Sequence, residues 1–453
     1  MSAGAARTQR LLAGPILPTL LKLAAPNLVL MLVQSSLGLI EAYWVGQLGT
    51  DALAGVALVF PALMLMQMMS AGAMGGGISS AIARAIGAKK HADANALVVH
   101  ALIIAIALGV FFSITILAGG RALYTLMGGR DAALDAALTY SNVLFAGIVL
   151  LWVFNALASV LRGTGNMLLP AIVVTAGAVV VIPLSPLLIF GWGPFPRLGV
   201  AGGAVAVLLY YAGSIPFLVR AVWSGRNVVK PHLRTTRIRG ALLYEILRVG
   251  LVAAAITVTT NVTVAITTGI VGNAGAQAIA GYGIGSRLEY LLIPLAFSIG
   301  APLVAMVGTC IGAGDHRRAL RAAWTGAALG GIVAETVGVI AAIFPSAWMS
   351  LFSADADVIA QGAQYLRIVG PCYGFFGVGM VLYFASQGAG RLAWPLIAGI
   401  TRMTVAGAGG WLAFQHTQNL GHVFSALACA LAVFGIIIVT AVARGAWSNT
   451  RAA

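Results

Sequence analysis

The chain has 453 residues, of which 60% are hydrophobic and 8% are charged, and its formal net charge is +15. A soluble globular chain has about a quarter of its residues charged, so this composition excludes a water-soluble protein of this size. A basic excess can indicate nucleic-acid binding, but here the basic residues are distributed among short loops between apolar segments, which is typical of membrane proteins.

Twelve apolar runs each approach the length of about 20 residues that an α-helix needs to cross a bilayer. A membrane-spanning barrel strand would need only about 10 residues of alternating polarity, so helices are favoured. The sequence therefore predicts an all-α integral membrane protein with twelve transmembrane helices. The predicted spans are 18–45, 52–78, 97–118, 133–161, 168–190, 200–223, 242–271, 276–309, 319–344, 357–386, 393–414 and 423–444.

The basic residues predict the orientation. With the N-terminus placed in the cytoplasm, 20 of the 26 basic residues fall on the cytoplasmic side. The positive-inside rule then predicts a multi-pass protein of the bacterial cytoplasmic (inner) membrane with both termini in the cytoplasm. These residues are Arg7, Arg10, Lys22, Arg84, Lys89, Lys90, Arg162, Arg220, Arg226, Lys230, Arg234, Arg237, Arg239, Arg248, Arg317, Arg318, Arg321, Arg391, Arg444 and Arg451.

An internal repeat relates the two halves of the chain. Tyr140, Gly163 and Pro170 have counterparts 225 residues later, at Tyr365, Gly388 and Pro395. Several matches at one offset indicate a duplication. Because each half has six spans, both halves enter the membrane from the same side. We therefore expect two homologous six-helix bundles related by a pseudo-twofold axis along the membrane normal, with a cavity between them.

The repeat predicts an N-terminal lobe at 1–225, a basic cytoplasmic linker at 226–240 and a C-terminal lobe at 241–453. Solute sites form at the interface of such repeats, which favours a carrier over a non-transporting membrane scaffold.

Three acidic residues lie inside predicted spans, where a charge is costly and indicates function or a specific partner. Glu41 shares a helix face with Asn27 and Gln34, because the three are spaced by seven residues. Such a polar stripe faces a cavity or partner helices. Glu41 is therefore our first candidate for binding a coupling ion, and a structural carboxylate bonded to a neighbour is the alternative.

Glu289 is the second ion-coupling candidate, and it shares a face with Tyr282. Arg367 or Arg402 of other spans is a possible partner, so a structural ion pair remains an open alternative. Glu335 lies among small residues, which favours a structural hydrogen bond. The polar residues expected to line a substrate cavity are Gln34, Gln67, Asn155, Tyr282, Glu335 and Arg367.

Several chemistries have no support in the sequence. There is no G-x-x-x-x-G-K-[S/T] phosphate loop and no C-x-x-C pair. The six histidines lie in loops or near span ends, and no nucleophile–base constellation is apparent. We therefore expect no catalytic residues, no bound metal and no cofactor.

The segments L-G-T-D-A-L-A-G-V-A at 48–57, A-R-A-I-G-A at 83–88 and L-R-G-T-G-N at 161–166, followed by Pro170, resemble the multidrug and toxic compound extrusion (MATE) family. The resemblance extends over about 15–445 and includes the duplicated forms in the second half. It implies a secondary antiporter that exports organic and often cationic compounds in exchange for protons or sodium ions. We expect the protein to function as a monomer, with a small organic substrate and the lipid bilayer as its partners.

The chain departs from the family pattern at several sites of ion coupling. Val181 and Ser185 stand where one branch has Asn and Asp, and Thr260-Asn261 and Arg367 stand where another branch has acids. Glu41 takes the place of an aspartate that carries the coupling ion. A carboxylate with few polar companions favours a proton over sodium, which prefers about five or six oxygen ligands. A flippase of lipids or lipid-linked precursors remains an alternative, because it would need a basic cavity and Arg287, Arg367 and Arg402 lie within spans.

Overall fold

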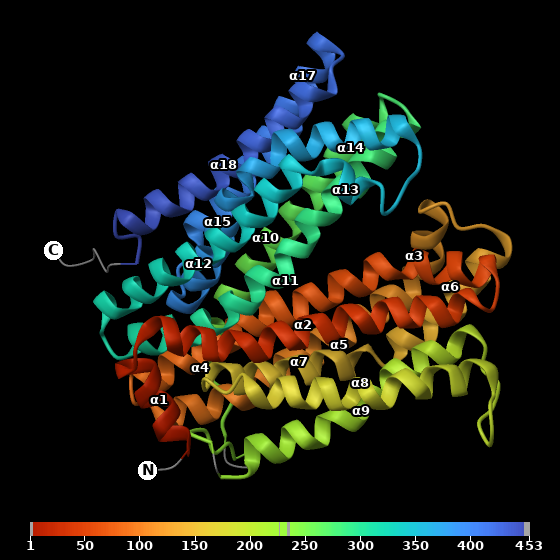
Figure 1. Ribbon diagram of the computed structural model, residues 1–453. Helices are drawn as coiled ribbons and strands as arrows, with labels where there is room; N and C mark the ends of the chain where they lie inside the picture. Colours follow the sequence, from red (N-terminus) through yellow and green to blue (C-terminus); the bar gives the residue numbers. More distant parts are fainter. Residues whose placement is uncertain (1–2, 226, 233–235, 448–453) are drawn as a thin grey trace. The chain divides into compact units, whose positions relative to one another are not determined.

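The computed structural model describes residues 3–225, 227–232 and 236–447, and no strand is present among them. Arg226, Arg234 and Arg451, which we assigned to the cytoplasmic side, lie outside the described residues. Figure 1 shows the helices in chain order. They are α1 (Ala3–Ala13), α2 (Ile16–Gly46), α3 (Thr50–Gln67), η1 (Met68–Met74), α4 (Gly75–Gly87), α5 (His91–Leu126), α6 (Asp131–Ala146), α7 (Ile148–Gly163), α8 (Leu168–Phe190), α9 (Val200–Trp223), α10 (Gly240–Gly272), α11 (Ala276–Gly312), α12 (His316–Ile343), α13 (Pro345–Met349), α14 (Ala356–Val369), η2 (Gly370–Cys372), α15 (Tyr373–Ala389), α16 (Ala393–Thr404), η3 (Val405–Gly409), α17 (Gly410–Thr417) and α18 (Leu420–Ala443).

The twelve predicted runs are all helical, but they do not give twelve unbroken helices. Within the described residues, ten helical stretches are long and apolar enough to cross a membrane. An eleventh span results if α6 and α7, which meet at a bend of 48°, are taken together. The run 393–414 is helical too, but the π-helical turn η3 divides it into the short helices α16 and α17. Bends and π-turns of this kind are tolerated where neighbouring groups satisfy the freed backbone.

The chain divides into two compact units. The first contains residues 1–10 and 25–250, and the second contains 11–24 and 251–453. These boundaries differ from the expected lobes at two places, because residues 11–24 join the second unit and residues 241–250 join the first. Both exchanges occur at the start of a long helix, α2 in one case and α10 in the other.

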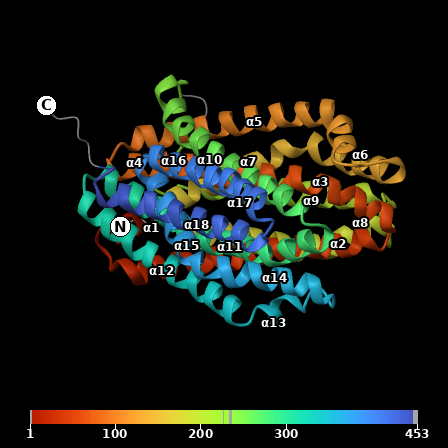
Figure 2. The same ribbon diagram turned by 90° about the horizontal axis from the view of Figure 1, so that it is seen from above.

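The helix packing of the first unit is repeated in the second. In the first unit α3 packs against α6, α5 against α7, α7 against α9 and α8 against α9. In the second unit the equivalent pairs are α11 with α14, α12 with α15, α15 with α18 and α16 with α18. Figure 2 shows α8 beside α9 and α16 beside α18 from a second direction. The duplication inferred from the sequence is therefore also a duplication of packing.

Glycines at equivalent positions explain part of this shared packing. A Cβ atom on Gly163 would lie 2.8 Å from the carbonyl oxygen of Ser79, and one on Gly388 would lie 2.7 Å from that of Val304. Ser79 and Val304 are themselves 225 residues apart. Both contacts are too close for any side chain, so each half needs glycine where these two helices meet.

Close contacts also hold the segments that precede α2 and α10. In the first unit, the carboxylate of Asp93 at the start of α5 pairs with the Arg239 guanidinium at 2.7 Å. The buried His100 accepts a hydrogen bond from the backbone N–H of Arg239 at 2.9 Å. In the second unit, Arg318 at the start of α12 donates to the carbonyl oxygens of Leu11, at 3.0 Å, and of Gly14.

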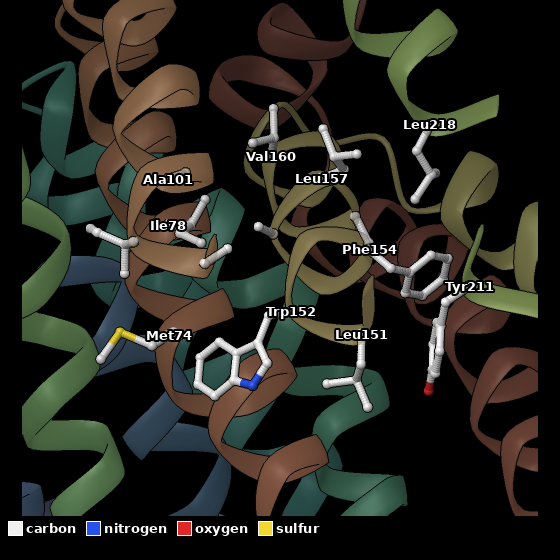
Figure 3. Close-up of a cluster of buried hydrophobic side chains, with 14 of the residues drawn as sticks. Met74, Ile78, Ala101, Leu151, Trp152, Phe154, Leu157, Val160, Tyr211 and Leu218 are labelled. Atoms are coloured by element: carbon white, nitrogen blue, oxygen red, sulfur yellow. The ribbon is translucent and has the colours of Figure 1, made fainter. Parts of the chain in front are cut away.

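The core of the first unit is apolar. Figure 3 shows the buried side chains of Met74 and Ile78 from η1 and α4, Trp152 and Phe154 from α7, and Tyr211 from α9. Helix α7 is the central element, because most of its residues from Ile148 to Gly163 are buried. A helix that is apolar around its whole circumference is one that other helices surround.

Candidate functional site

Glu41 lies on α2 and has a buried partner. The hydroxyl of Tyr140, on α6, donates a hydrogen bond of 2.6 Å to Oε1 of Glu41. Gly203 of α9 lies beside the same oxygen, and a Cβ atom there would be 3.0 Å from it. Glycine at this position leaves space for the carboxylate. Three helices of the first unit therefore form the surroundings of this acid.

The other two residues of the predicted polar stripe have no such partner. Asn27 is fully buried, and neither polar atom of its side chain forms a hydrogen bond with a described residue. Gln34 is half-buried and likewise has no hydrogen-bond partner in the described part of the chain. The structure thus distinguishes Glu41 from the rest of its stripe, since Glu41 alone is linked to another helix.

Gln67 and Asn155, both predicted to line a cavity, lie together in the first unit. Nδ2 of Asn155 donates to Oγ of Ser70 at 2.8 Å and, more weakly, to Oε1 of Gln67 at 3.4 Å. Ser70 belongs to the π-helical turn η1, which interrupts the long span between α3 and α4. Asn155 is almost completely buried on α7. This amide therefore fixes the position of the π-turn against the central helix.

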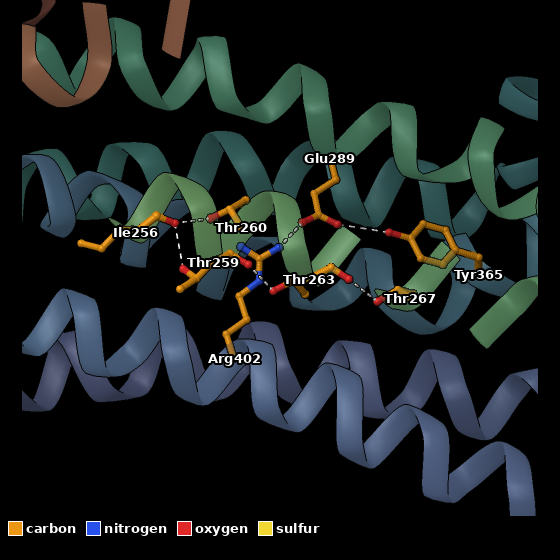
Figure 4. A network of polar contacts seen from close by, with 8 residues as sticks. All are labelled: Ile256, Thr259, Thr260, Thr263, Thr267, Glu289, Tyr365 and Arg402. Atoms are coloured by element: carbon orange, nitrogen blue, oxygen red, sulfur yellow. Dashed lines mark hydrogen bonds and ion pairs between the residues drawn. The ribbon is translucent and has the colours of Figure 1, made fainter. Parts of the chain in front are cut away.

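In the second unit, Glu289 of α11 forms an ion pair. Its Oε1 lies 2.6 Å from NH2 of Arg402 on α16, and its Oε2 accepts a hydrogen bond of 3.3 Å from the hydroxyl of Tyr365 on α14 (Figure 4). Arg402 is thus the partner of Glu289 among the two arginines considered from the sequence. Both side chains are mostly removed from solvent, with exposures of 7% for Arg402 and 19% for Glu289.

Aromatic side chains surround the ion pair. The Arg402 guanidinium carbon lies 5.1 Å from the ring centroid of Phe376 and 5.8 Å from that of Phe434. These distances are in the range of cation–π contacts, which stabilise a guanidinium outside water. On the other side, Tyr282 and Tyr365 meet edge to face at 5.3 Å. Tyr282 is therefore part of a packed aromatic wall.

Helix α10 borders this cluster with hydroxyl groups. Thr263 donates to the carbonyl oxygen of Thr259 at 2.7 Å, and Thr267 donates to that of Thr263 at 2.8 Å (Figure 4). The side chain of the nearby Asn261 also bonds to its own helix, at the carbonyl oxygen of Thr257. Threonines that bond to the preceding turn satisfy their own polar groups within an apolar span.

Glu335 and Arg367, the remaining predicted residues, lie apart from the ion pair. Oε2 of Glu335, on α12, accepts the backbone N–H of Gly374 at 2.7 Å. Gly374 is in the first turn of α15, where backbone N–H groups lack partners within their own helix. Arg367 is exposed on α14 and has no hydrogen bond or ion pair with a described residue. Arg287, which we also considered, lies over the ring of Phe352 at 5.2 Å.

Sequence reasoning did not assign a site role to Tyr140, Tyr365 or Ser70. Tyr140 and Tyr365 were recognised only as markers of the repeat, although two buried tyrosines at one offset are themselves a signal of a shared hydrogen-bonding role. Ser70 follows Gln67 by three residues and shares its helix face. In the part of the chain that the structure describes, no group of three or more His, Cys, Asp or Glu residues could hold a metal ion.

Comparison with known proteins gives the context of these sites. Residues 26–187 and 253–412 match the family model MatE. The FAD transporter of Shewanella oneidensis is 26% identical over 401 residues, which cover 87% of each chain. The probable multidrug resistance protein NorM of Thermotoga maritima is 27% identical over 386 residues, 83% of this chain and 81% of that protein.

Solved structures match over almost the entire chain. A MATE transporter crystallised in its bent conformation has a TM-score of 0.89 and 25% identity, with 99% of this chain and all of the other covered. A MOP superfamily transporter from Pyrococcus furiosus has a TM-score of 0.87 and 27% identity, with 96% and 97% covered. For that protein, reverse polarity of the binding pocket is said to suggest a different function.

Proposed function

Because the chain belongs to the MatE family of multidrug efflux transporters, we propose that it is a secondary antiporter that exports organic compounds in exchange for protons. The observation that carries the proposal is the contact between Glu41 and Tyr140, with a distance of 2.6 Å between the two oxygens. It joins an ionisable group on α2 to a neighbouring helix inside a membrane-spanning unit. We place the protein in the bacterial cytoplasmic membrane with both termini in the cytoplasm.

Proton binding at Glu41 alters this contact. The ionised carboxylate accepts the Tyr140 hydroxyl in a charge-assisted hydrogen bond, which is about twice as strong as a neutral one. A protonated Glu41 is a weaker acceptor and carries a proton to donate. The free energy that links α2 to α6 therefore depends on the proton. A ligand drives a conformational change only through such a difference in binding between two states.

Protons are favoured over sodium ions by the surroundings of Glu41. Among the described residues the carboxylate has one hydrogen-bond donor, Tyr140, and Gly203 lies beside the same oxygen. A sodium ion prefers several oxygen ligands, which this arrangement does not offer.

A proteoliposome assay tests the proposal. Purified protein is reconstituted, a pH gradient is imposed, and uptake of a fluorescent organic cation is compared for the wild type and Glu41→Gln. Asp135→Asn is the matched control, because Asp135 is an exposed acid on α6, the helix of Tyr140. We expect gradient-driven uptake by the wild type and the control, and its loss in Glu41→Gln.

Other outcomes would change the assignment. Equal uptake by the wild type and Glu41→Gln would remove Glu41 as the coupling residue. Uptake that is driven by a sodium gradient and not by a pH gradient would make sodium, rather than the proton, the coupling ion. Absence of uptake under both gradients, with lipid scrambling by the same vesicles, would favour the flippase alternative.

A second candidate substrate class is an aromatic organic anion. The relative from Shewanella oneidensis is named an FAD transporter, and FAD is a phosphate-containing anion. The observation in this chain that favours an anion is the buried guanidinium of Arg402 in the second unit. Competition of FAD with the fluorescent cation in the same vesicles distinguishes the two classes.

A further inference from the structure

Arg402 is a buried cation with most of its hydrogen-bonding capacity unused. The residue is 5% exposed, and its guanidinium makes one hydrogen bond to a described residue, from NH2 to Oε1 of Glu289. A guanidinium has five N–H donors. Four of them therefore have no hydrogen-bonded partner in the described part of the chain. No Arg402 nitrogen is among the fully enclosed side-chain atoms without a hydrogen-bond partner, so the unused donors keep some access for a ligand or water.

The contact with Glu289 is not the strongest that these two groups can form. Arginine and a carboxylate often pair through two parallel hydrogen bonds. Here one carboxylate oxygen contacts Arg402, while the other accepts from Tyr365 at 3.3 Å. Glu289 therefore shares its oxygens between two donors on different helices. A free carboxylate or phosphate could instead present two oxygens to the same guanidinium.

The fold does not itself need a cation at this position. The position equivalent to Arg402 in the first unit is Gly177, because the two differ by 225. There the ring of Tyr210 fills the space, and a Cβ atom on Gly177 would overlap it. The same helix pair, α8 with α9, thus packs without an arginine. A charge retained at this depth in only one half requires a reason other than packing.

The guanidinium is also held in place for binding. The rings of Phe376 and Phe434, both almost completely buried, have their centroids 5.1 and 5.8 Å from its central carbon. Contacts with aromatic faces restrict the long side chain without consuming its N–H donors. A preorganised guanidinium loses less entropy when an anion binds.

We propose that Arg402 binds the carboxylate or phosphate group of a transported organic anion, and that Glu289 occupies this site as an internal competitor when no anion is present. The proposal rests on the proposed transport function and names a substrate class for it. When the anion binds, Glu289 keeps the Tyr365 hydroxyl as its hydrogen-bond donor.

Binding measurements on the purified full-length protein test the proposal. The probe is fluorescein, an aromatic anion with a carboxylate, and its affinity is measured by fluorescence polarisation in nanodiscs of phosphatidylcholine. Glu289→Gln removes the competing charge but preserves the shape of the side chain. We expect it to bind fluorescein on the order of tenfold more tightly than the wild type, the size of a single hydrogen bond to a charged group.

Arg402→Gln should lose binding by a similar or larger factor, and Arg402→Lys should recover only part of it because an ammonium cannot form the planar fork. Arg287→Gln is the matched control, since Arg287 is an exposed arginine near Glu289 on α11 that lies over Phe352. The control should bind as the wild type does. An affinity of Glu289→Gln equal to or weaker than that of the wild type would overturn the proposal.

Two further measurements keep these outcomes interpretable. If size-exclusion chromatography shows that Arg402→Gln is misfolded, the double variant Glu289→Gln/Arg402→Gln is used instead, because it removes both charges of the pair. Fluorescein binding by the double variant would overturn the proposal.

Competition with fluorescein identifies the class of ligand. Competition by benzoate indicates a soluble organic anion, and competition by phosphatidylglycerol indicates a lipid headgroup. Competition by neither would contradict an oxyanion site.

Failure of this inference is separable from failure of the antiport proposal. Wild-type protein from the same preparation is assayed for cation exchange driven by a pH gradient. If the protein exchanges the cation but Glu289→Gln does not change fluorescein binding, the antiport proposal stands and the anion site is contradicted. If Glu289→Gln binds fluorescein more tightly as expected but no exchange occurs, the anion site stands and the antiport proposal is contradicted.

Discussion

The hydroxyl groups of Tyr140 and Tyr365 occupy equivalent positions of the two halves, and each donates a hydrogen bond to a glutamate on another helix. The acceptors are not equivalent. Glu41 lies on the first long helix of its half, whereas Glu289 lies on the second long helix of the other half. In this part of the repeat the offset is 226, as Gly49 and Gly275 show, so the residues equivalent to these acids are Thr267 and Leu63. The duplication has therefore preserved the donor, while each half has acquired its carboxylate at a different place.

Removing the Tyr140 hydroxyl should change the pH dependence of exchange. Tyr140→Phe deletes a hydrogen bond to an ionised group, which is typically worth about 1.5–3 kcal/mol. The loss weakens the contact of the ionised carboxylate with α6, so the pH dependence of exchange should differ from that of the wild type. Stopped-flow transport at a series of pH values measures this. Tyr124→Phe is the control, because Tyr124 is also buried and bonds to Ser141 at 2.6 Å; an identical shift in both variants would contradict the prediction.

In a double-mutant cycle on the stability of the protein, Glu289 and Arg402 should show a large coupling energy. Breaking a buried ion pair by removing one partner costs about 3–5 kcal/mol, because the other charge is left without a partner. We expect Arg402→Met to lower the unfolding temperature in detergent strongly, and Glu289→Gln/Arg402→Met to recover much of the loss. The more exposed pair of Arg248 and Glu245, at 3.2 Å, supplies the comparison; its coupling should be about 0–1 kcal/mol. Additive effects at Glu289 and Arg402 would show that the pair is not coupled.

Glu335 should behave as a structural acceptor. Its Oε2 accepts the N–H of Gly374 at 2.7 Å, at the break between η2 and α15. Glu335→Gln retains an oxygen that can accept this bond, whereas Glu335→Ala retains none and should destabilise the protein by about 1–3 kcal/mol. Thermal unfolding of both variants, with transport measured on the folded fraction, tests this. Loss of transport in a stable Glu335→Gln variant would instead place the carboxylate in the transport cycle.

Gly338 should tolerate no side chain. A Cβ atom there would overlap the carbonyl oxygen of Gly370, where α12 meets η2. Gly338→Ala must push the two backbones apart, and we expect a destabilisation of about 1–3 kcal/mol. Gly119→Ala is the matched control, since Gly119 is helical in α5 and a Cβ atom there would have no neighbour within 4 Å. The control should unfold at the wild-type temperature or slightly above it, because alanine favours a helix.

His100 should protect the backbone amide of Arg239, directly before α10, from hydrogen exchange. It receives the N–H of Arg239 at 2.9 Å on Nε2, and its Nδ1 lies 2.8 Å from the carbonyl oxygen of Ala96. His100→Phe removes the acceptor, so hydrogen exchange of the Arg239 amide should accelerate by about fivefold, as expected for a hydrogen bond of about 1 kcal/mol. His91→Phe, at the exposed start of the same helix, should leave this exchange unchanged.

The spans were predictable because each long apolar run has to be a helix in a bilayer, whatever its neighbours. The predicted limits 168–190 and 200–223 coincide with α8 and α9. What could not be predicted is where a span breaks. The π-turn at Met68–Met74 depends on Asn155, which lies far away in the sequence and bonds to Ser70. Local periodicity contains no information about such a partner.

The intramembrane acids were predictable for the same reason, since a charge inside a span stands out. Their partners were not. Arg367 and Arg402 are equally plausible partners of Glu289 from spacing alone, yet only Arg402 reaches it, because α16 packs beside α18 within the second unit and Arg367 is exposed on α14. The choice depends on the direction of each side chain around its helix.

The contacts made by Asp93 and Arg318 have a consequence for how this chain can be assembled. These residues are equivalent, and so are their partners Gly14 and Arg239, since each pair differs by 225. Asp93 pairs with Arg239, which precedes the second half, and Arg318 binds the carbonyl oxygen of Gly14, which precedes the first. Two copies of the first half would bring a carboxylate to a carbonyl oxygen, and two copies of the second would bring arginine to arginine. The two contacts therefore favour the pairing of unlike halves: produced as separate polypeptides, the halves should associate with each other in preference to their own copies.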